Sequence, residues 1–274
     1  MNVEGKICVV TGGASGIGAA LCAAFAAQGA AGIVVVDRNV AGAEAVAAKV
    51  GGVAIGCDLG VRSEVEAMIT GAREHYGRID VLCNNAGIAN DRDFLSGDAE
   101  EWDQQWRINV MSHVWAVRAV LPEMLERGEG YLQHTASMAG ILTSHGAAAY
   151  ASTKHAVVGL AEWLSITYHN RGIRVFLLAP LGVDTPMLNT DSEFARQAAG
   201  PIVGPDTVAQ QVLDAFAADR FLVLTDPIAQ EWMGRKTEDL ERWLRGMRRM
   251  QDRLASSDSF GSTRSEERRV GKEC

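Results

Sequence analysis

Short β-branched runs alternate with longer segments of helical pattern along most of the chain, and this alternation limits the possible folds more than any other feature. The runs that predict strands are Ile7–Val10, Ile33–Val36, Val53–Cys57, Ile79–Cys83, Tyr131–Thr135, Val175–Leu178 and Phe221–Leu224. The intervening segments that predict helices include Gly16–Gln28, Ala41–Lys49, Ser63–Tyr76, Glu100–Arg127 and Tyr150–His169. Such alternation indicates a parallel sheet covered by helices on both faces. We therefore expect one α/β domain over residues 1–260, with a doubly wound, seven-stranded parallel sheet.

A glycine-rich turn, TGGASGIG at Thr11–Gly18, follows the first expected strand directly and leads into an alanine-rich helix. Its glycines suit a turn that needs positive φ angles, backbone that can approach a pyrophosphate, and a helix N-terminus with free N–H groups. In a doubly wound sheet this turn lies at the carboxyl edge of the strands, where ligands bind. The pattern predicts a Rossmann-type dinucleotide site that includes Gly12, Ser15, Gly16, Ile17 and Gly18.

Asp37 ends the second expected strand, at a place where a carboxylate can accept hydrogen bonds from both hydroxyls of an adenosine ribose. The same carboxylate would repel a 2′-phosphate, which favours NAD as the cofactor. Arg38 leaves NADP open, because a guanidinium there could bind the 2′-phosphate. The alternative for Asp37 is a solvated residue that starts a turn.

Charge and composition exclude several classes of partner. The formal net charge is −8 with acidic and basic residues interleaved, so no basic stripe predicts a nucleic-acid surface. Five cysteines lack metal-ligand spacing and read as buried thiols in a reducing compartment, and no metal site is expected. No run of about 18 apolar residues indicates a membrane span. We expect a cytoplasmic protein without nucleic-acid or membrane partners.

The C-terminal part divides into two segments. Between Glu231 and Leu254 apolar residues recur at helical spacing, which predicts an amphipathic helix over about residues 231–256. This helix could pack on the domain, contact a partner, or form a lid over the pocket. Residues 261–274 show no hydrophobic periodicity and are expected to be a disordered, appended or vector-derived tail.

Several further motifs complete a recognisable set. They are Asp58-Leu59, NNAG at Asn84–Gly87, Asn109, Ser137 and YASTK at Tyr150–Lys154. Together with the glycine-rich turn, in this order and at these separations, they make the chain resemble the short-chain dehydrogenase/reductase family over nearly residues 1–225. The resemblance implies a Rossmann fold, a nicotinamide cofactor and oxidoreductase activity on an alcohol or ketone, and it suggests a homotetramer.

Tyr150 and Lys154 stand four residues apart and therefore share one face of a helix. A phenol has a pKa of about 10, so a base working near neutral pH needs that pKa lowered by roughly 3 units, or about 4 kcal/mol. The Lys154 ammonium and a positively charged nicotinamide ring could supply this lowering by favouring the phenolate. Tyr150 is thus expected to be the catalytic acid/base.

The resemblance implies roles for further residues. Lys154 would also hold the nicotinamide ribose, Ser137 would hydrogen-bond the substrate oxygen, and Asn109 would anchor a water in a proton relay. The remaining cofactor contacts implied are Asp58 and Leu59 at the adenine, Asn85, Ala86 and Gly87 along the ribose, and Pro180, Val183 and Thr185 near the carboxamide.

The match to the family is incomplete at two places. Leu181 follows Pro180 where the family usually has glycine, which puts an apolar side chain near the nicotinamide pocket. The usual Asp-Gly-Gly after the last strand is absent, and Thr225, Asp226 and Pro227 stand there instead. These departures leave the local backbone path open.

The expected substrate pocket is largely apolar. Its walls would come from Ile88–Phe94, Met138–His145 and the loop after Pro180, with Phe194 in that loop. This lining predicts a small hydrophobic secondary alcohol or its ketone as substrate. His145 could hydrogen-bond a second polar group on it, or face solvent as an ordinary loop histidine. The proposed substrate contacts are Met138, His145, Leu181, Met187 and Leu188.

Two other functions compete with this reading. An NADPH-dependent carbonyl reductase is the nearest alternative, and Asp37 argues against it. A non-catalytic NAD sensor or scaffold would be expected to lose the catalytic set, yet Asn109, Ser137, Tyr150 and Lys154 are all present. Lyase or epimerase activity would call for a longer substrate domain.

Overall fold

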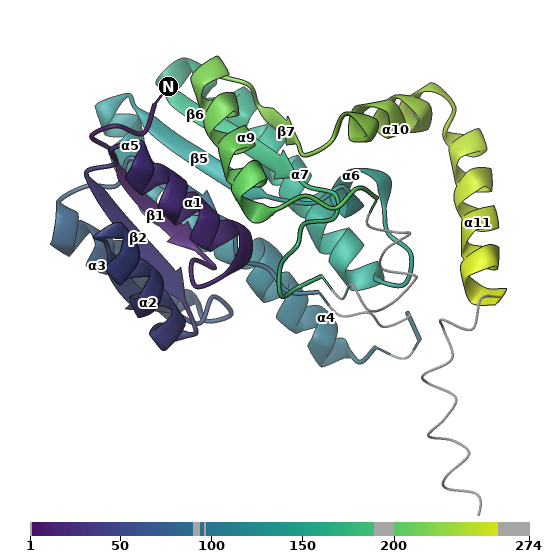
Figure 1. Cartoon of the computed structure of the whole chain (residues 1–274), viewed down its shortest axis with the longest axis horizontal. Helices are drawn as coiled ribbons and strands as arrows, with labels where there is room; N and C mark the ends of the chain where they lie inside the picture. Colours follow the sequence, from purple (N-terminus) through teal and green to yellow (C-terminus); the bar gives the residue numbers. More distant parts are fainter. Residues whose placement is uncertain (1, 90–93, 96, 189–199, 257–274) are drawn as a thin grey trace, which may run out of the picture.

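A computed structural model describes residues 2–89, 94–95, 97–188 and 200–256 of the chain. It contains a seven-stranded parallel sheet with the strand order β3-β2-β1-β4-β5-β6-β7 (Figure 1). The strands are β1 (Ile7–Thr11), β2 (Gly32–Asp37), β3 (Val53–Gly56), β4 (Val81–Asn84), β5 (Gly130–Thr135), β6 (Ile173–Ala179) and β7 (Leu222–Leu224). This confirms the predicted α/β fold. The strand order reverses between β1 and β4, which places the binding crevice of such a sheet at their carboxyl ends.

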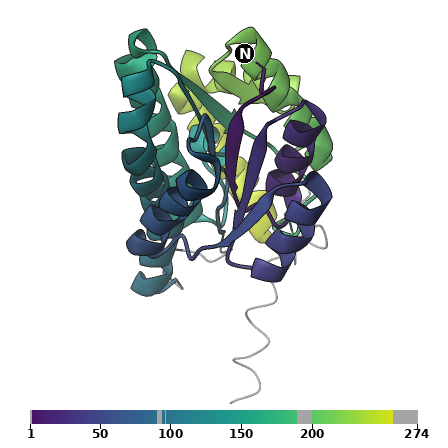
Figure 2. The same ribbon diagram turned by 90° about the vertical axis from the view of Figure 1, so that its left-hand side faces the viewer.

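Helices cover both faces of the sheet, as Figure 2 shows edge-on. One layer holds α1 (Gly16–Ala27), α2 (Val40–Val50) and α9 (Pro205–Ala218), and the other holds α3 (Arg62–Tyr76), α5 (Ser112–Arg127) and α7 (Ala148–Tyr168). Cys8 and Val10 of β1 pack in the first core, whereas Val9 between them packs in the second. Apolar residues therefore follow one another directly along β1 and β2, because both faces of these strands are buried.

The predicted helix Glu100–Arg127 is interrupted in the structure. It consists of α4 (Ala99–Trp106), a π-helical turn at Arg107–Met111 and then α5. A π turn widens a helix by one residue and is often found at functional sites. Here it contains Asn109, whose side chain is completely buried.

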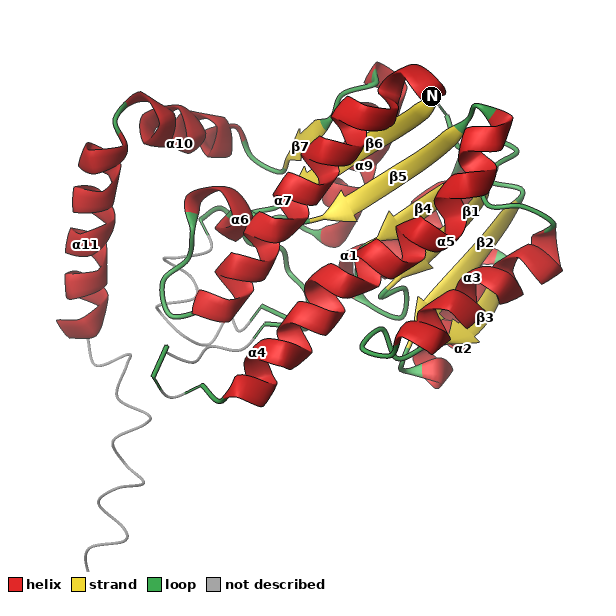
Figure 3. Ribbon diagram, turned by 180° about the vertical axis from the view of Figure 1, so that it is seen from behind, coloured by secondary structure: helices red, strands yellow, loops and turns green. Residues whose placement is uncertain are grey.

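Two helices occupy the segment for which a single amphipathic helix was expected. After α6 (Ala139–Leu142) and β7, the chain forms α10 (Pro227–Glu238) and α11 (Leu240–Ser256), which extend from one end of the sheet (Figure 3). Asp239 between them is extended, with φ −148° and ψ 92°, and its side chain accepts a hydrogen bond from the Arg242 backbone N–H. The carboxylate thus caps the start of α11, a role that competes with a continuous helix. Residues 261–274 and Phe194 lie outside the described residues.

The cysteines and the helix lengths were also the subject of predictions. Cys8, Cys22, Cys57 and Cys83 are buried free thiols, as predicted. Burial raises the pKa of Cys22 to about 12, which keeps its thiol protonated. None of the described helices has the length and apolar composition needed to cross a membrane.

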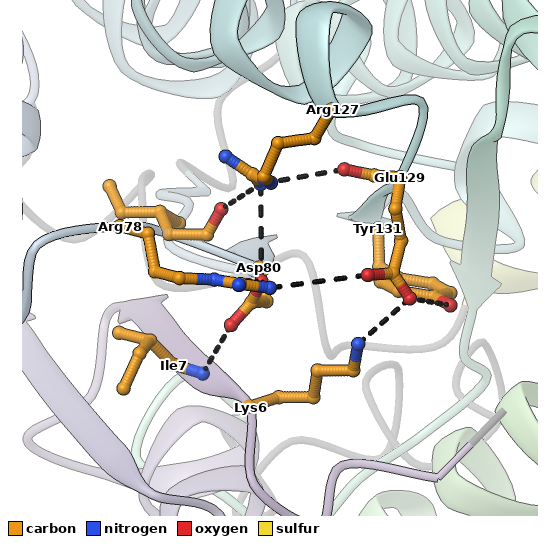
Figure 4. A network of polar contacts seen from close by, with 8 residues as sticks. Lys6, Ile7, Arg78, Asp80, Arg127, Glu129 and Tyr131 are labelled. Carbon is orange, nitrogen blue, oxygen red and sulfur yellow. Dashed lines mark hydrogen bonds and ion pairs between the residues drawn. The ribbon is translucent and has the colours of Figure 1, made fainter.

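A polar network joins the amino ends of the central strands, at the edge opposite the glycine-rich turn (Figure 4). Asp80, which is 2% exposed, accepts a hydrogen bond from the Ile7 backbone N–H at 2.9 Å and one from Arg78 Nε at 2.8 Å. Arg127 approaches the same carboxylate at 3.9 Å and donates to the Ile79 carbonyl at 2.8 Å. The network therefore ties β1 to the segment that enters β4 and to the end of α5.

Replacing Asp80 by Asn should lower the free energy of unfolding by about 2 kcal/mol, because the buried acceptor loses the charge that its two arginines bind. Urea denaturation would measure this change. Glu66→Gln, which breaks only the exposed Arg62–Glu66 pair, should cost under about 0.5 kcal/mol. Equal effects of the two substitutions would contradict the role given to Asp80.

A buried pair of histidines lies beneath the carboxyl end of β5. His113 of α5 and His134 of β5 are essentially inaccessible, and their Nδ1 atoms are 3.0 Å apart. Burial lowers the pKa of His134 to about 4, and burial followed by the neighbouring His134 and Lys154 lowers the pKa of His113 well below its ordinary value. Both rings are therefore neutral near pH 7.

This pair should make the protein acid-sensitive. The unfolded chain binds protons at histidine near pH 6.5, whereas folded His134 stays neutral until about pH 4, so stability falls as the pH drops through this interval. His134 alone accounts for about 3 kcal/mol of that loss. Urea denaturation of the wild type and of His134→Gln at pH 7 and pH 4.5 should show a smaller loss in the variant. An equal loss would mean that His134 is not held neutral.

Candidate active site

A cavity of about 600 Å³ opens at the carboxyl edge of the sheet. Its walls come from the segments that follow β1, β2, β3, β4, β5 and β6, together with α10 and α11. Of the predicted site residues, those that line it are Gly12, Ser15, Gly16, Ile17, Asp37, Arg38, Asp58, Leu59, Asn85, Ala86, Gly87, Ser137, Met138, His145, Tyr150, Lys154, Pro180, Leu181, Val183, Thr185, Met187 and Leu188. Gly18 and Asn109 do not line the cavity and lie behind its wall.

The glycines of the glycine-rich turn pack too closely against their neighbours to be replaced by residues with a side chain. A Cβ on Gly12, where φ is +68°, would lie 3.0 Å from Ala86 Cα, and a Cβ on Gly16, where φ is +52°, would lie 3.0 Å from Thr185 Cγ2. A Cβ on Gly18 would be 2.1 Å from the Gly12 carbonyl oxygen. The turn brings the N-terminus of α1 to the cavity, and no side chain caps that terminus. This geometry suits a phosphate group.

Asp37 lies at the end of β2 with both carboxylate oxygens oriented by backbone. Oδ2 accepts a hydrogen bond from Ala14 N at 3.2 Å and Oδ1 accepts one from Asn39 N at 2.9 Å. The side chain is thus held beside the glycine-rich turn, while Arg38 is exposed on the same wall. A negative charge here disfavours a second anionic group at the same place.

Asn85 joins three strands behind the cofactor end of the cavity. Its Nδ2 donates to the Thr11 carbonyl at 3.1 Å, and its Oδ1 accepts from Thr135 Oγ1 at 3.1 Å. Thr11 Oγ1 in turn accepts from the Asn85 backbone N–H at 2.9 Å. The ends of β1, β4 and β5 are therefore locked together, which positions the following residues Ala86 and Gly87 on the wall.

Lys154 is the central charged group of the site. It is 2% exposed, and its Nζ donates to the Thr135 carbonyl at 2.9 Å and lies 5.6 Å from the centroid of the Tyr150 ring. Burial lowers the pKa of Lys154 to about 8. A Cβ on Gly87 would be 3.1 Å from Nζ, so glycine at this position leaves room for the ammonium.

The environment of Tyr150 differs from the expectation in one respect. Burial raises the pKa of its phenol, and a hydrogen bond with Ser137 opposes this rise. The expected lowering, which was assigned to Lys154 together with a positively charged nicotinamide ring, is therefore not produced by the protein groups alone. Ser137 follows β5 and accepts a hydrogen bond from the Ala139 backbone N–H at 3.1 Å, which fixes its Oγ near the phenol.

Asn109 acts as a clamp behind the wall. Its Oδ1 accepts from Ile88 N at 2.8 Å, and its Nδ2 donates to the Ile88 carbonyl at 2.9 Å and to Thr153 Oγ1 at 3.0 Å. The side chain thus connects the segment after β4 to α7, next to Lys154. The Ile88 N–H uses one lone pair of Oδ1, and the second lone pair remains for a water. The role of Asn109 as a water anchor stays a prediction.

Leu181 packs at the end of the cavity that is formed by α6 and α10. It belongs to an apolar cluster with Met138, Leu142 and Trp232, and its backbone N–H donates to Thr225 Oγ1 at 3.1 Å. Both residues stand where the sequence departs from the family pattern, Thr225 after β7 and Leu181 after β6. Thr225 thus orients Leu181. Met187 and Leu188 lie further out, and Met187 is exposed.

Sequence reasoning missed the apolar residues that the last two helices place on the cavity wall, which are Trp232 of α10 and Trp243, Met247 and Met250 of α11. The helical spacing of the last three was visible in the sequence. The break at Asp239 lets α11 turn back over the cavity, and this turn brings the three side chains to the cavity wall.

The comparisons with known proteins agree with this architecture. A family model described as short chain dehydrogenase matches residues 6–196. The 1-deoxy-11-beta-hydroxypentalenate dehydrogenase of Streptomyces exfoliatus is 35% identical over 252 residues, covering 88% of this chain and 90% of that protein. The D-threitol dehydrogenase of Mycolicibacterium smegmatis is 36% identical over 191 residues, 68% of this chain and 73% of its own length.

A solved structure gives the same result. A short chain dehydrogenase/reductase from Burkholderia phymatum, crystallised in complex with NAD, superposes with a TM-score of 0.79 at 27% identity, covering 88% of this chain and 96% of its own. The match of the family model to most of the chain, the relatives and the shared fold lead to one conclusion: this chain is a member of the short-chain dehydrogenase/reductase family.

Proposed function

We propose that the protein is an NAD-dependent oxidoreductase that interconverts a hydrophobic secondary alcohol and its ketone. The observation that carries the proposal is that Tyr150, Ser137 and Lys154 share the wall of one cavity with the glycine-rich turn and Asp37. A dinucleotide bound along that turn would bring its reactive end toward the phenol. Membership of an oxidoreductase family supports the reaction type.

The residues present fit a nicotinamide dinucleotide. The uncapped N-terminus of α1 and the tightly packed glycines of the turn suit the pyrophosphate, and the oriented carboxylate of Asp37 suits a ribose with two free hydroxyls. When bound, the nicotinamide accepts or supplies the hydride. Lys154 is the residue to hold the nicotinamide ribose, because its ammonium is fixed at the centre of the wall by Thr135.

The proton is handled by Tyr150 and Ser137. In the oxidative direction the phenolate oxygen of Tyr150 takes the proton from the substrate hydroxyl, and Ser137 Oγ donates a hydrogen bond to the substrate oxygen. Burial opposes the phenolate, so cationic charge must favour it. Lys154 supplies one such charge, and an oxidised nicotinamide carries the second.

The apolar end of the cavity supports a hydrophobic substrate. Met138, Leu181, Trp243, Met247 and Met250 line it beyond the catalytic residues. The names of the relatives refer to quite different hydroxylated substrates, so the lining and not the relatives carries this part of the proposal. A homotetramer and a cytoplasmic location remain predictions.

Tyr150→Phe should lower kcat/KM for alcohol oxidation by at least about 100-fold, because the substrate proton loses its acceptor. Absorbance of reduced nicotinamide during oxidation of a panel of alicyclic alcohols would measure it. NAD binding, followed by calorimetry, should survive. Tyr168→Phe, at the far end of the same helix, is the matched control. Retained turnover in Tyr150→Phe would remove the acid/base assignment.

Asp37→Asn should raise the kcat/KM for NADP relative to NAD by about tenfold or more, because it removes a repulsion worth roughly 1.4 kcal/mol or more. Steady-state kinetics with both cofactors test this. Glu44→Gln, an exposed change on nearby α2, should leave the ratio unchanged. A wild type that already prefers NADP would instead favour the carbonyl reductase, with Arg38 as the phosphate ligand.

A further inference from the structure

α11 forms the outer wall of the substrate end of the cavity. Trp243, Met247 and Met250 line the cavity, whereas Arg242 and Arg249 on the same helix are exposed. α10 connects this helix to the domain through contacts with α6 and β7 and through a hydrogen bond from Lys236 to the Ile141 carbonyl. The side of α11 that faces the site is therefore apolar, and the substrate must pack against it.

One polar contact between side chains links α11 to the segment just before Tyr150. Gln251 Oε1 lies 2.8 Å from Nδ1 of His145, five residues ahead of the catalytic tyrosine. An amide oxygen can only accept, so Nδ1 of His145 carries a hydrogen. In the neutral imidazole the other nitrogen, Nε2, then presents a lone pair and acts as an acceptor.

Nε2 of His145 has no hydrogen-bond partner among the described residues and is shielded from solvent, although the residue lines the cavity. An acceptor that is buried without a donor loses its hydration and gains nothing in return. A ligand that brings a donor to this atom would correct the deficit. The side chains around this end of the cavity are mainly apolar. Nε2 would therefore distinguish apolar substrates that carry a hydrogen-bond donor from those that do not.

We propose that His145 Nε2 accepts a hydrogen bond from a second hydroxyl group of the substrate, and that Gln251 positions the ring for it. The substrate class is then an apolar, alicyclic diol or hydroxyketone, whose second hydroxyl is separated from the reacting carbon by the apolar framework. This inference rests on the proposed function and specifies its substrate. His145 is a specificity residue, and Gln251 acts only through it.

The test uses the full-length enzyme with NAD and a matched set of probes. These are decahydronaphthalen-2-ol, its analogues with a second hydroxyl on the other ring, and the corresponding methyl ethers, which can accept but not donate. In the wild type at least one diol should have a kcat/KM about tenfold above that of the mono-alcohol, the value expected for one good hydrogen bond. The methyl ethers should behave like the mono-alcohol.

Variants then assign the effect to the two residues. His145→Phe should reduce the ratio of the kcat/KM for the diol to that for the mono-alcohol from about tenfold to about one. Gln251→Met should reduce the preference mainly through KM, and Gln251→Glu should restore it, because a carboxylate also accepts from Nδ1. His75→Phe, an exposed histidine on α3, is the matched control and should change neither substrate.

Three results would overturn the proposal. They are no preference for any diol, an equal loss on both substrates in His145→Phe, or a preference for the ethers, which would make Nε2 a donor. In each case oxidation of the mono-alcohol still depends on Tyr150, so the proposed function stands. Absence of turnover with every alcohol and ketone tested would instead count against the proposed function itself.

Discussion

The hydrogen bond from the Lys154 ammonium to the Thr135 carbonyl fixes the relative positions of the helix and the strand that form the centre of the candidate site. It connects α7 to the carboxyl end of β5 and thereby places Tyr150, one turn earlier on the same helix, at the cavity. A buried cation is costly, and the cost shows in the lowered pKa of the lysine. The surroundings accommodate it through Gly87, which leaves room for Nζ, and through neutral His113 and His134, which add no second positive charge nearby.

The two edges of the sheet carry different kinds of polar contact. At the amino edge, charged side chains pair with one another around Asp80 and hold the strands in register. At the carboxyl edge, polar side chains such as Asn85 and Asn109 hydrogen-bond to backbone and leave the functional groups free for ligands. The ion pairs around Asp80 thus lie at one edge of the sheet and the cavity lies at the other, where parallel sheets bind ligands.

Much of this could be predicted from local sequence. Strand positions followed from β-branched runs because strands buried on both faces are mostly apolar, and the glycine-rich turn was recognisable because few other residues tolerate its geometry. What could not be predicted depends on contacts between distant segments. The pairing of His113 with His134, the π-helical turn at Asn109 and the burial that raises the pKa of Tyr150 all arise from tertiary packing. The return of α11 depends on one carboxylate at Asp239, which a periodic pattern of apolar residues does not reveal.

The extended residue at Asp239 separates two parts of the cavity that come from different stretches of chain. The wall that contains Tyr150 and Lys154 is formed by segments between residues 12 and 188, whereas much of the outer wall belongs to α11. Substitutions in that helix would alter the shape of the pocket without disturbing the sheet edge. Changes of a few residues in α11 would therefore alter the shape of the space beside Tyr150 while the contacts that position Tyr150 and Lys154 stay the same.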